Sequence, residues 1–302
     1  IDPDLIEWLP VLRLSDQPAG TVRQGVASEL GLGGEVLVSA GGGDNMMGAI
    51  GTGNTSLGKV TVSLGTSGTV YAYSDEPVVD PAGEVAAFCD STGGWLPLVC
   101  TMNVTVATEH MRRLLGLSHA GLEEAVSGAP PGSDGLLLLP YLTGERTPNV
   151  PHGKGVLYGL TPKCLTVGHL CRAAMEGATM GLNYGFNRLR ELGIDPVEVR
   201  LTGGGTRNKA WRRIAADVFD AEVVTLREEE GAAYGAALQA MWTHRLSLGE
   251  RVSMSEITDE VVEIDEPSRL KPIRRNVETY RGLQSNQDRL SMDLRGLFSG
   301  SG

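Results

Sequence analysis

Alternation of apolar runs with helix-like segments between residues 197 and 244 restricts the fold of this chain more than any other feature. Residues 197–202 and 222–226 have the apolar, β-branched character of strands, whereas residues 209–219 and 232–244 have the pattern of helices. Strands that alternate with helices favour a sheet that contains parallel strands and is covered by helices. We therefore expect an α/β fold.

Other segments fit the same class. Residues 59–64 and 69–73 alternate polar and apolar side chains around Gly-Thr-Ser-Gly, which predicts a β-hairpin. Residues 136–142 form a continuous apolar run, typical of a buried strand. The strongest helix is expected over 166–192, where small residues in the apolar stripe indicate a close crossing with another element. A surface helix is expected over 277–294, and a short helix over 20–32.

Composition limits the possible partners. The 302 residues are 41% hydrophobic and 21% charged, which is a globular composition. No apolar run approaches the roughly 20 residues that span a bilayer, so we expect no membrane insertion. The net charge of −11 argues against nucleic acid as the main partner. The four cysteines lack metal-ligand spacing, which favours reduced thiols in a cytoplasmic protein.

The first residues of the chain resemble neither a translation start nor a targeting signal. The sequence begins with Ile-Asp-Pro and continues as a chain that is already under way. We expect a further segment upstream.

One acidic residue lies among glycines that follow a predicted strand. In Ser-Ala-Gly-Gly-Gly-Asp-Asn, residues 39–45, the only carboxylate belongs to Asp44, and Asn45 comes next. Phosphoryl transfer needs one acidic group beside the accepting hydroxyl. The structural alternative is that Asp44 forms an Asx turn or caps a helix.

Two glycine-containing turns are candidate nucleotide contacts. Glycines in such turns let backbone N–H groups approach an anion, as residues 65–68 would allow directly after a strand. Gly203, Gly204 and Gly205 connect a predicted strand to a predicted helix and precede Asn208. Each could equally be an ordinary turn: the first in a hairpin, the second one that needs positive φ. The chain contains no P-loop and no dinucleotide fingerprint.

The loop Pro-Tyr-Leu-Thr-Gly-Glu-Arg-Thr-Pro, residues 140–148, places Glu145 beside Arg146. A structural ion pair between them and a functional role are both open. The five histidines show no HExxH or triad spacing, and Ser67 lacks the GxSxG context of a hydrolase nucleophile.

Taken together and in this order, these motifs resemble the FGGY family of carbohydrate kinases. The similarity extends to Gly-Val-Leu-Tyr-Gly-Leu at 155–160, followed by His169-Leu170 and by Ala-Ala-Met-Glu at 173–176. Within the family, residues 140–148 and 100–104 look most like xylulokinases. The resemblance covers roughly residues 1–290 and only the second half of the family's length. The first actin-like lobe, with its phosphate hairpin and most sugar contacts, has no counterpart here.

The resemblance implies an actin/hexokinase-like (ribonuclease H-like) α/β ATPase domain, consisting of the C-terminal lobe and the end of the N-terminal lobe. Residues 1–55 would end the sugar-binding domain, 56–258 would form the ATP-binding domain, and 259–302 a polar helix and tail. The implied reaction is ATP-dependent phosphorylation of a sugar, D-xylulose to D-xylulose 5-phosphate, with Mg²⁺ bound to the phosphates.

The resemblance also implies roles for individual residues. Asp44 would be the catalytic base, and Asp44 and Asn45 would bind the sugar. Gly65, Thr66 and Ser67 would bind the ATP phosphates, while Gly203, Gly204 and Asn208 would bind adenosine. No protein ligand to a metal is assigned, and a homodimer is left open.

Two alternatives remain. The chain could belong to another FGGY kinase, namely a ribulokinase, gluconokinase or glycerol kinase. It could also be a non-catalytic actin-like nucleotide-binding module, which would not need Asp44. If the chain is half of a two-lobed enzyme, it should be inactive alone and expose apolar faces near residues 39–50 and along 166–192.

Overall fold

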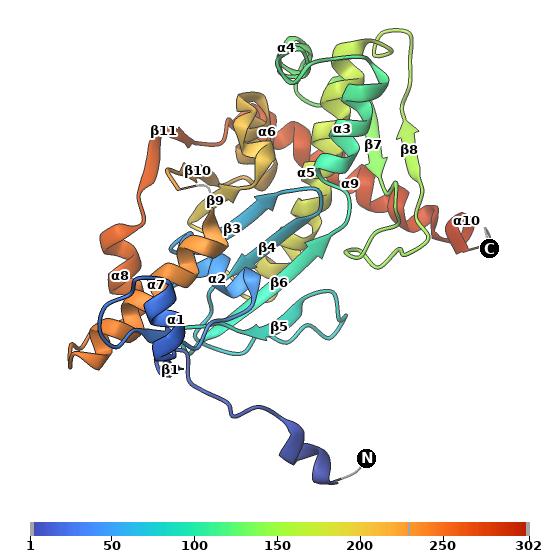
Figure 1. Ribbon diagram of the computed structural model, residues 1–302. Helices are drawn as coiled ribbons and strands as arrows, with labels where there is room; N and C mark the ends of the chain where they lie inside the picture. The colour runs from blue at the N-terminus through green and yellow to red at the C-terminus, as the bar shows by residue number, and fades with distance from the viewer. Residues whose placement is uncertain (1–2, 229, 300–302) are drawn as a thin grey trace.

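A seven-stranded sheet forms the centre of the computed structural model, which describes residues 3–228 and 230–299 (Figure 1). Its strand order is β11-β10-β9-β3-β4-β6-β5. The strands are β3 (Lys59–Leu64), β4 (Gly68–Ala72), β5 (Ala86–Cys89), β6 (Trp95–Thr101), β9 (Glu198–Thr202), β10 (Glu222–Leu226) and β11 (Ile264–Leu270).

The sheet is mixed, with three parallel strands in its middle. β3, β9 and β10 run parallel. β4, β6 and β5 extend the sheet beyond β3 with antiparallel pairing, and β11 pairs antiparallel with β10. Ser63 of β3 is paired with Thr202 of β9, so both strands end at the same edge of the sheet. The predicted α/β fold with parallel strands and the predicted hairpin at 59–73 are confirmed.

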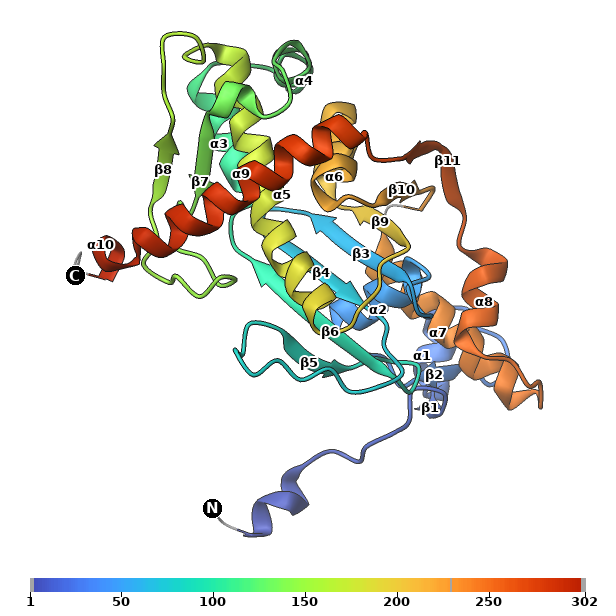
Figure 2. The ribbon, with the colours of Figure 1, turned by 180° about the vertical axis from the view of Figure 1, so that it is seen from behind.

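Helices cover both faces of the sheet, as opposite views show (Figures 1 and 2). On one face lie α5 (Val167–Glu191) and α6 (Lys209–Phe219), with α9 (Arg274–Asp293) packed against both. On the other face lie α2 (Asp44–Gly51) and α7 (Gly231–Ser247), which pack against each other, and α8 (Met254–Val261). Because α6 and α7 follow neighbouring strands to opposite faces, a crevice opens where β9 and β10 end.

The remaining elements lie beside the sheet. Helices α3 (Thr105–Leu114) and α4 (His119–Gly128) pack against α5. The predicted buried strand at 136–142 is found as β7 (Leu137–Pro140), and all four of its residues are buried. Among the strands of the described residues it pairs only with β8 (Gly155–Tyr158), in a separate two-stranded sheet.

Small residues in α5 do permit close crossings. A Cβ atom at Gly177 would overlap the carbonyl group of Leu138 in β7, and one at Gly185 would overlap the side chain of Val99 in β6. Both overlaps involve buried neighbours, so α5 can lie this close to two sheets only with glycine at these positions.

Helices α2 and α7 approach each other even more closely. A Cβ at Gly235 would overlap the carbonyl oxygen of Met47, and one at Gly51 would overlap that of Gly231. This backbone-to-backbone contact holds the start of α2, and therefore Asp44, in a fixed position above the ends of β3 and β9.

Several elements differ from the sequence expectations. The helix expected over 20–32 is only α1 (Gln24–Glu29), which lies between β1 (Pro18–Thr21) and β2 (Leu37–Ser39). Helices α4 and α8 and strand β11 were not expected. The helix predicted over 277–294 as a surface helix is α9, whose inner face is buried and includes Val277 and Tyr280. The chain also contains the short helices η1 (Pro3–Trp8), η2 (Ser133–Gly135) and α10 (Arg295–Ser299), and residues 300–302 of the expected tail lie outside the described part.

The expectation of exposed apolar faces was placed on the wrong elements. Helix α5 is enclosed by its own chain, and Met47 and Ile50 of α2 are buried against α7 and α8. A run of closely spaced exposed apolar side chains lies instead in the N-terminal segment, which projects from the body (Figures 1 and 2). They are Leu5, Trp8, Leu9, Val11, Leu12 and Leu14, followed by Leu30, Leu32 and Val38.

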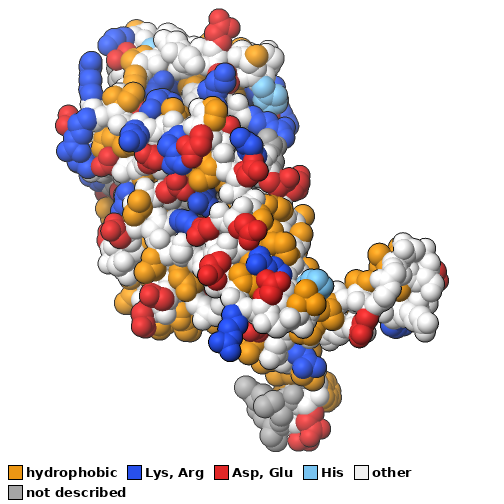
Figure 3. All heavy atoms as spheres, turned by 90° about the vertical axis from the view of Figure 1, so that its left-hand side faces the viewer, with side chains coloured by type: hydrophobic (Ala, Val, Ile, Leu, Met, Phe, Trp, Pro, Cys, Tyr) orange, Lys and Arg blue, Asp and Glu red, His pale blue; other side chains and the backbone are white. Residues whose placement is uncertain are grey.

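The surface is otherwise mixed. Figure 3 shows acidic, basic and hydrophobic side chains interspersed over one face. Among the described residues, none of the helices combines the length and apolar character needed to cross a bilayer.

Candidate active site

The turn between β3 and β4, residues 65–67, is called the first glycine turn here. Its carbonyl groups are bonded to the start of α3: Thr105 N–H donates to Gly65 O at 2.9 Å, and Val104 N–H donates to Thr66 O at 3.2 Å. The side chains of Thr66 and Ser67 are exposed. Within the described part of the chain, the N–H groups of Thr66 and Ser67 make no hydrogen bond.

The bonded carbonyls determine where those N–H groups point. In a planar trans peptide the C=O and the following N–H point in opposite directions. Since the carbonyls of Gly65 and Thr66 face α3, the N–H groups of Thr66 and Ser67 face away from it. The turn therefore presents two unused backbone donors and two hydroxyl groups, an arrangement suited to an anion.

The second glycine turn, residues 203–205, follows β9 and leads through η3 (Gly204–Arg207) into α6. Gly203 has a φ of +85°, and a Cβ there would lie 2.9 Å from the carbonyl oxygen of Leu64. The backbone conformation and the close approach to Leu64 therefore both require glycine at position 203. Neither requirement holds at Gly204, where a Cβ would meet nothing within 4 Å.

The two glycine turns are neighbours, because β3 and β9 end side by side. Gly203 packs directly on Leu64 and Gly65, which begin the first turn. Two candidate nucleotide contacts that are far apart in the sequence are thus brought together at one edge of the sheet.

Asp44 lies at the same edge, as the first residue of α2. Gly43 is the N-cap residue, so Asp44 does not have the capping role considered above. Its Oδ1 atom accepts hydrogen bonds from the backbone N–H of Asn45 at 2.8 Å and from Asn45 Nδ2 at 3.1 Å. Oδ2 accepts none from the described residues, and the exposed carboxylate is free to accept a proton on that side.

Asp44 and Asn45 open into a cavity of about 200 Å³, the Asp44 cavity. Strands β3, β4 and β9 supply its floor through Ser63, Thr69, Tyr71 and Thr202, and Gly203 of the second glycine turn borders it. The carboxylate therefore faces a small polar space beside both turns.

Sequence reasoning missed the polar floor of this cavity. Thr61 pairs with Tyr71 and Ser63 with Thr69, so these four side chains share one face of the hairpin. Burial raises the pKa of Tyr71; Thr61 partly opposes the shift and the charge of Asp44 adds to it, so the phenol stays neutral. The signal was present as polar residues at every second position on both sides of Gly-Thr-Ser-Gly.

Two larger cavities flank the second glycine turn. The Asn208 cavity, about 490 Å³, has apolar walls from Leu122, Met175 and Trp211. Its polar lining includes Thr105, Thr108 and Glu109 of α3, together with Gly204 and Asn208. A flat, mostly apolar group with a few polar atoms would fit such a lining.

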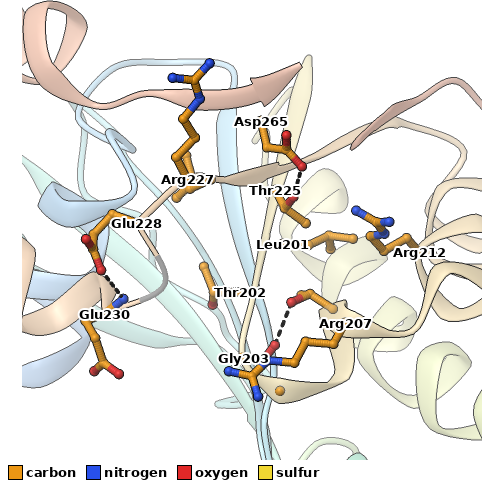
Figure 4. Close-up of a pocket in the computed structure, with 13 residues that line it drawn as sticks. Leu201, Thr202, Gly203, Arg207, Arg212, Thr225, Arg227, Glu228, Glu230 and Asp265 are labelled. Atoms are coloured by element: carbon orange, nitrogen blue, oxygen red, sulfur yellow. Dashed lines mark hydrogen bonds between the residues drawn. The ribbon is translucent and has the colours of Figure 1, made fainter. Parts of the chain in front are cut away.

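The other large cavity, about 650 Å³, is the Arg212 cavity in the crevice between β9 and β10. Figure 4 shows Arg207, Arg212 and Arg227 in the lining of this cavity, with Asp265 of β11 hydrogen-bonded to Thr225. Its lining is far more charged than that of the Asn208 cavity. Gly204 borders both cavities.

Asn208 serves the fold as well as lining a cavity. It is the N-cap of α6, and its side chain accepts a hydrogen bond from Trp211 N at 3.0 Å. This bond uses the side-chain oxygen and leaves the amide NH₂ to face the cavity.

The loop at 140–148 does not contain the ion pair considered for Glu145 and Arg146. Among the described residues no salt bridge joins them, and the Glu145 carboxylate binds backbone N–H groups and Asn103 instead. Burial raises the pKa of Glu145, while the hydrogen bonds from Asn103 and the backbone oppose that shift.

Within residues 3–228 and 230–299, no cluster of three or more His, Cys, Asp or Glu side chains could hold a metal ion. Side-chain oxygen atoms near the two glycine turns include the carboxylate of Asp44 and the hydroxyls of Thr66 and Ser67.

The mixed sheet with helices on both faces has the actin/hexokinase-like fold that the motifs predicted. The chain belongs to the FGGY family of carbohydrate kinases, since residues 60–244 match the model of the family's C-terminal domain. The xylulose kinase of Haemophilus influenzae is 42% identical over 91% of this chain and 55% of its own length. That of Streptomyces coelicolor is 41% identical over 80% of this chain and 47% of its own length.

Solved structures agree on the fold. The ligand-bound xylulose kinase of Lactobacillus acidophilus superposes with a TM-score of 0.89 at 22% identity, over 100% of this chain and 62% of that one. The xylulose kinase of Bifidobacterium adolescentis gives a TM-score of 0.76 at 32% identity, over 91% of this chain and 53% of that one. The chain thus spans about half the length of the curated relatives it matches.

Proposed function

We propose that this chain is the ATP-binding lobe of a xylulose kinase, which transfers the γ-phosphoryl group of ATP to D-xylulose and forms D-xylulose 5-phosphate. The meeting of both glycine turns and Asp44 at one sheet edge carries the proposal. The name shared by the relatives supports the sugar. Residues 1–55 would end the sugar-binding domain, 56–258 would form the ATP-binding domain, and 259–302 would form a polar helix and tail.

In this proposal the enzyme also needs the half that its relatives have outside the region matched by this chain. We use the term two-lobed kinase for this chain joined to a half equivalent to the one that its relatives have beyond the matched region. Sugar contacts and the remaining phosphate contacts would come from that half.

In this proposal the first glycine turn binds the β- and γ-phosphates. The N–H groups of Thr66 and Ser67 and their hydroxyls would donate to phosphate oxygens, and Gly65 lets the backbone approach. Such donors stabilise the charge that the transferring group carries in the transition state.

Asp44 would orient the sugar hydroxyl in line with the γ-phosphorus and accept its proton through Oδ2. Asn45 would hold the carboxylate in place through its bonds to Oδ1, and its remaining amide atoms face the space for the sugar. Tyr71 below them is a neutral donor that can bind the acceptor or the carboxylate.

Adenosine would occupy the Asn208 cavity. The adenine ring needs apolar walls, which Leu122, Met175 and Trp211 provide, and polar contacts, which Asn208 and Thr108 provide. Gly203 and Gly204 let the nucleotide pass over the turn toward the phosphates.

Mg²⁺ fits this site as a partner of the nucleotide, since it usually keeps waters and binds substrate phosphates rather than an all-protein cage. Asp44, Thr66 and Ser67 supply the nearby oxygen atoms. Bound there, the ion would neutralise charge on the phosphates. The four free cysteines support a reducing compartment, the cytoplasm, and a homodimer is compatible with this assignment.

A sugar panel tests the proposed activity. The two-lobed kinase is incubated with ATP, Mg²⁺ and D-xylulose, ribulose, gluconate or glycerol, and ADP release is coupled to a spectroscopic signal. We expect kcat/KM to be highest for D-xylulose. A higher value for another acceptor would assign the chain to a different kinase of the family.

Gly204 offers a test of the nucleotide site. Gly204→Val in the two-lobed kinase should leave the fold intact, because the added side chain enters open space. It should narrow the cavities on both sides of the turn. Steric overlap between the new side chain and the nucleotide should cost about 1–3 kcal/mol, so the Kd for ATP should rise roughly 5- to 150-fold.

Calorimetry would measure that affinity and thermal unfolding would check the fold. Gly282→Val is the matched control, since Gly282 also has open space around its Cβ position but lies on α9, outside all three cavities. Unchanged ATP affinity in a folded Gly204→Val enzyme would contradict the proposal that adenosine binds at the second glycine turn.

A further inference from the structure

The loop at 140–148 contains a buried carboxylate that the proposed function leaves without a role. Glu145 is 4% exposed and lies just beyond β7, outside the main sheet. Its Oε1 atom accepts from Met102 N at 2.6 Å and from Arg146 N at 2.8 Å, and its Oε2 atom accepts from Asn103 Nδ2 at 3.0 Å. A side chain with these bonds fixes backbone rather than presenting itself to a substrate.

Asn103 completes the connection between two loops. Besides Glu145, its Nδ2 donates to Gly144 O at 2.6 Å, and its Oδ1 accepts from Thr143 N and Thr143 Oγ1 at 3.3 and 3.2 Å. Asn103 is 2% exposed. Residues 102–103 are thereby fastened to residues 143–146 by a fully satisfied polar network, which makes the joint rigid.

The segment fastened in this way is the one that orients the first glycine turn. Directly after Asn103, the N–H groups of Val104 and Thr105 bind the carbonyls of Thr66 and Gly65. On the other side of Met102, Thr101 is paired with Gly68, at the far end of the same turn. Residues 101–105 thus hold the turn at both ends, and Glu145 and Asn103 hold residues 102–103.

We propose that Glu145 is a positioning residue, which aims the N–H groups of Thr66 and Ser67 at the β- and γ-phosphates by fixing residues 102–103. The inference rests on the proposed function and assigns a role to one more residue of that site. Glu145 touches no substrate. It acts through Met102 and Asn103 on the carbonyls of the first glycine turn.

This role predicts a selective defect. If the N–H groups of Thr66 and Ser67 change orientation, their contacts to the β- and γ-phosphates weaken. The contacts to adenosine and the α-phosphate remain. Glutamine at position 145 keeps the size of the side chain, but its NH₂ group cannot accept the bond from Asn103 or from the backbone. A purely structural role would instead weaken every nucleotide alike or lower stability only.

The test compares ATP and AMP binding to the two-lobed kinase. In Glu145→Gln, the Kd for ATP measured by calorimetry should rise at least about tenfold, as expected for a lost hydrogen bond to a charged group. The Kd for AMP, measured by competition, should stay within about twofold of the unsubstituted enzyme.

Asp80→Asn is the matched control. Asp80 is also buried, at 8% exposure, and also accepts from backbone N–H groups, those of Ala82, Glu84 and Val85. It lines none of the three cavities. Asp80→Asn should lower the thermal unfolding temperature and leave the ratio of ATP to AMP affinity unchanged.

A second variant decides the question if Glu145→Gln does not fold. Asn103→Ser removes the bonds to Glu145 and Thr143 while Glu145 keeps its bond to Met102, and it should shift the same ratio in the same direction. An unchanged ratio in the folded variants would overturn the role of Glu145. Failure of the proposed function would be seen separately, as equal affinity for ATP and AMP in the unsubstituted enzyme.

Discussion

Replacing Asp44 with asparagine in the two-lobed kinase is expected to lower kcat for D-xylulose by about 10²- to 10⁴-fold and to leave the KM for ATP nearly unchanged. The amide occupies the same volume and can still bind Asn45. It cannot accept the proton that the sugar hydroxyl loses as its bond to phosphorus forms. Steady-state kinetics by coupled ADP release, with both substrates varied, would measure the two parameters.

Asp259→Asn provides a control for this substitution. Asp259 is an exposed carboxylate of α8 that pairs with Lys59 and lines none of the three cavities. We expect it to leave kcat and both KM values unchanged. A near-normal kcat in Asp44→Asn would remove Asp44 from the reaction.

The apolar pattern and turn residues of a single segment were enough to predict several helices and strands. Gly-Thr-Ser-Gly between alternating runs predicted the hairpin of β3 and β4, and the long 3.6-residue stripe predicted α5 almost to its ends. The strand–helix alternation predicted β9, α6, β10 and α7. In each case one segment contains both its own apolar pattern and its own turn residues.

Elements that depend on distant partners were missed. Strand β11 contains Asp265, Glu266 and Pro267, a composition typical of a loop. It forms because β10 offers a free edge, where proline is tolerated. The buried face of α9 was likewise missed because its sequence is largely polar. Tyr280 on that face is bonded to Arg172 and Glu176 of α5, which are distant in the sequence.

The motifs of the site could be predicted from the sequence, but their arrangement in space could not. The residues around Gly65 and Gly203 do not indicate that β3 and β9 are parallel neighbours, because that pairing is determined by the whole sheet. The sequence also places Glu145 next to Arg146, so an ion pair between them was one of two open possibilities. In the fold, the partners of Glu145 are Met102 and Asn103, brought close by the packing of α3 and β7 against α5.

The largest effect is expected from separating the two lobes. In this chain alone, Thr66, Ser67 and Asp44 are exposed. Phosphoryl transfer needs a site that excludes water and binds the phosphates from both sides. We therefore expect the 302-residue chain to bind ATP weakly and to phosphorylate no sugar.

The exposed N-terminal segment agrees with this expectation. Trp8 and Leu12 are 81% and 90% exposed, and Val11 between them is 79% exposed. Apolar side chains in such numbers are usually covered by a partner surface. In the two-lobed kinase the other half would supply that surface.

Turnover of D-xylulose by the chain alone and by the two-lobed kinase, measured side by side by ADP release, tests the central claim most directly. The account predicts roughly 1–100 turnovers per second for the two-lobed kinase, the usual range of kinases, and no turnover above background for the chain alone. Turnover by the chain alone at an ordinary kinase rate would contradict the account, as would an inactive two-lobed kinase that is folded and binds ATP.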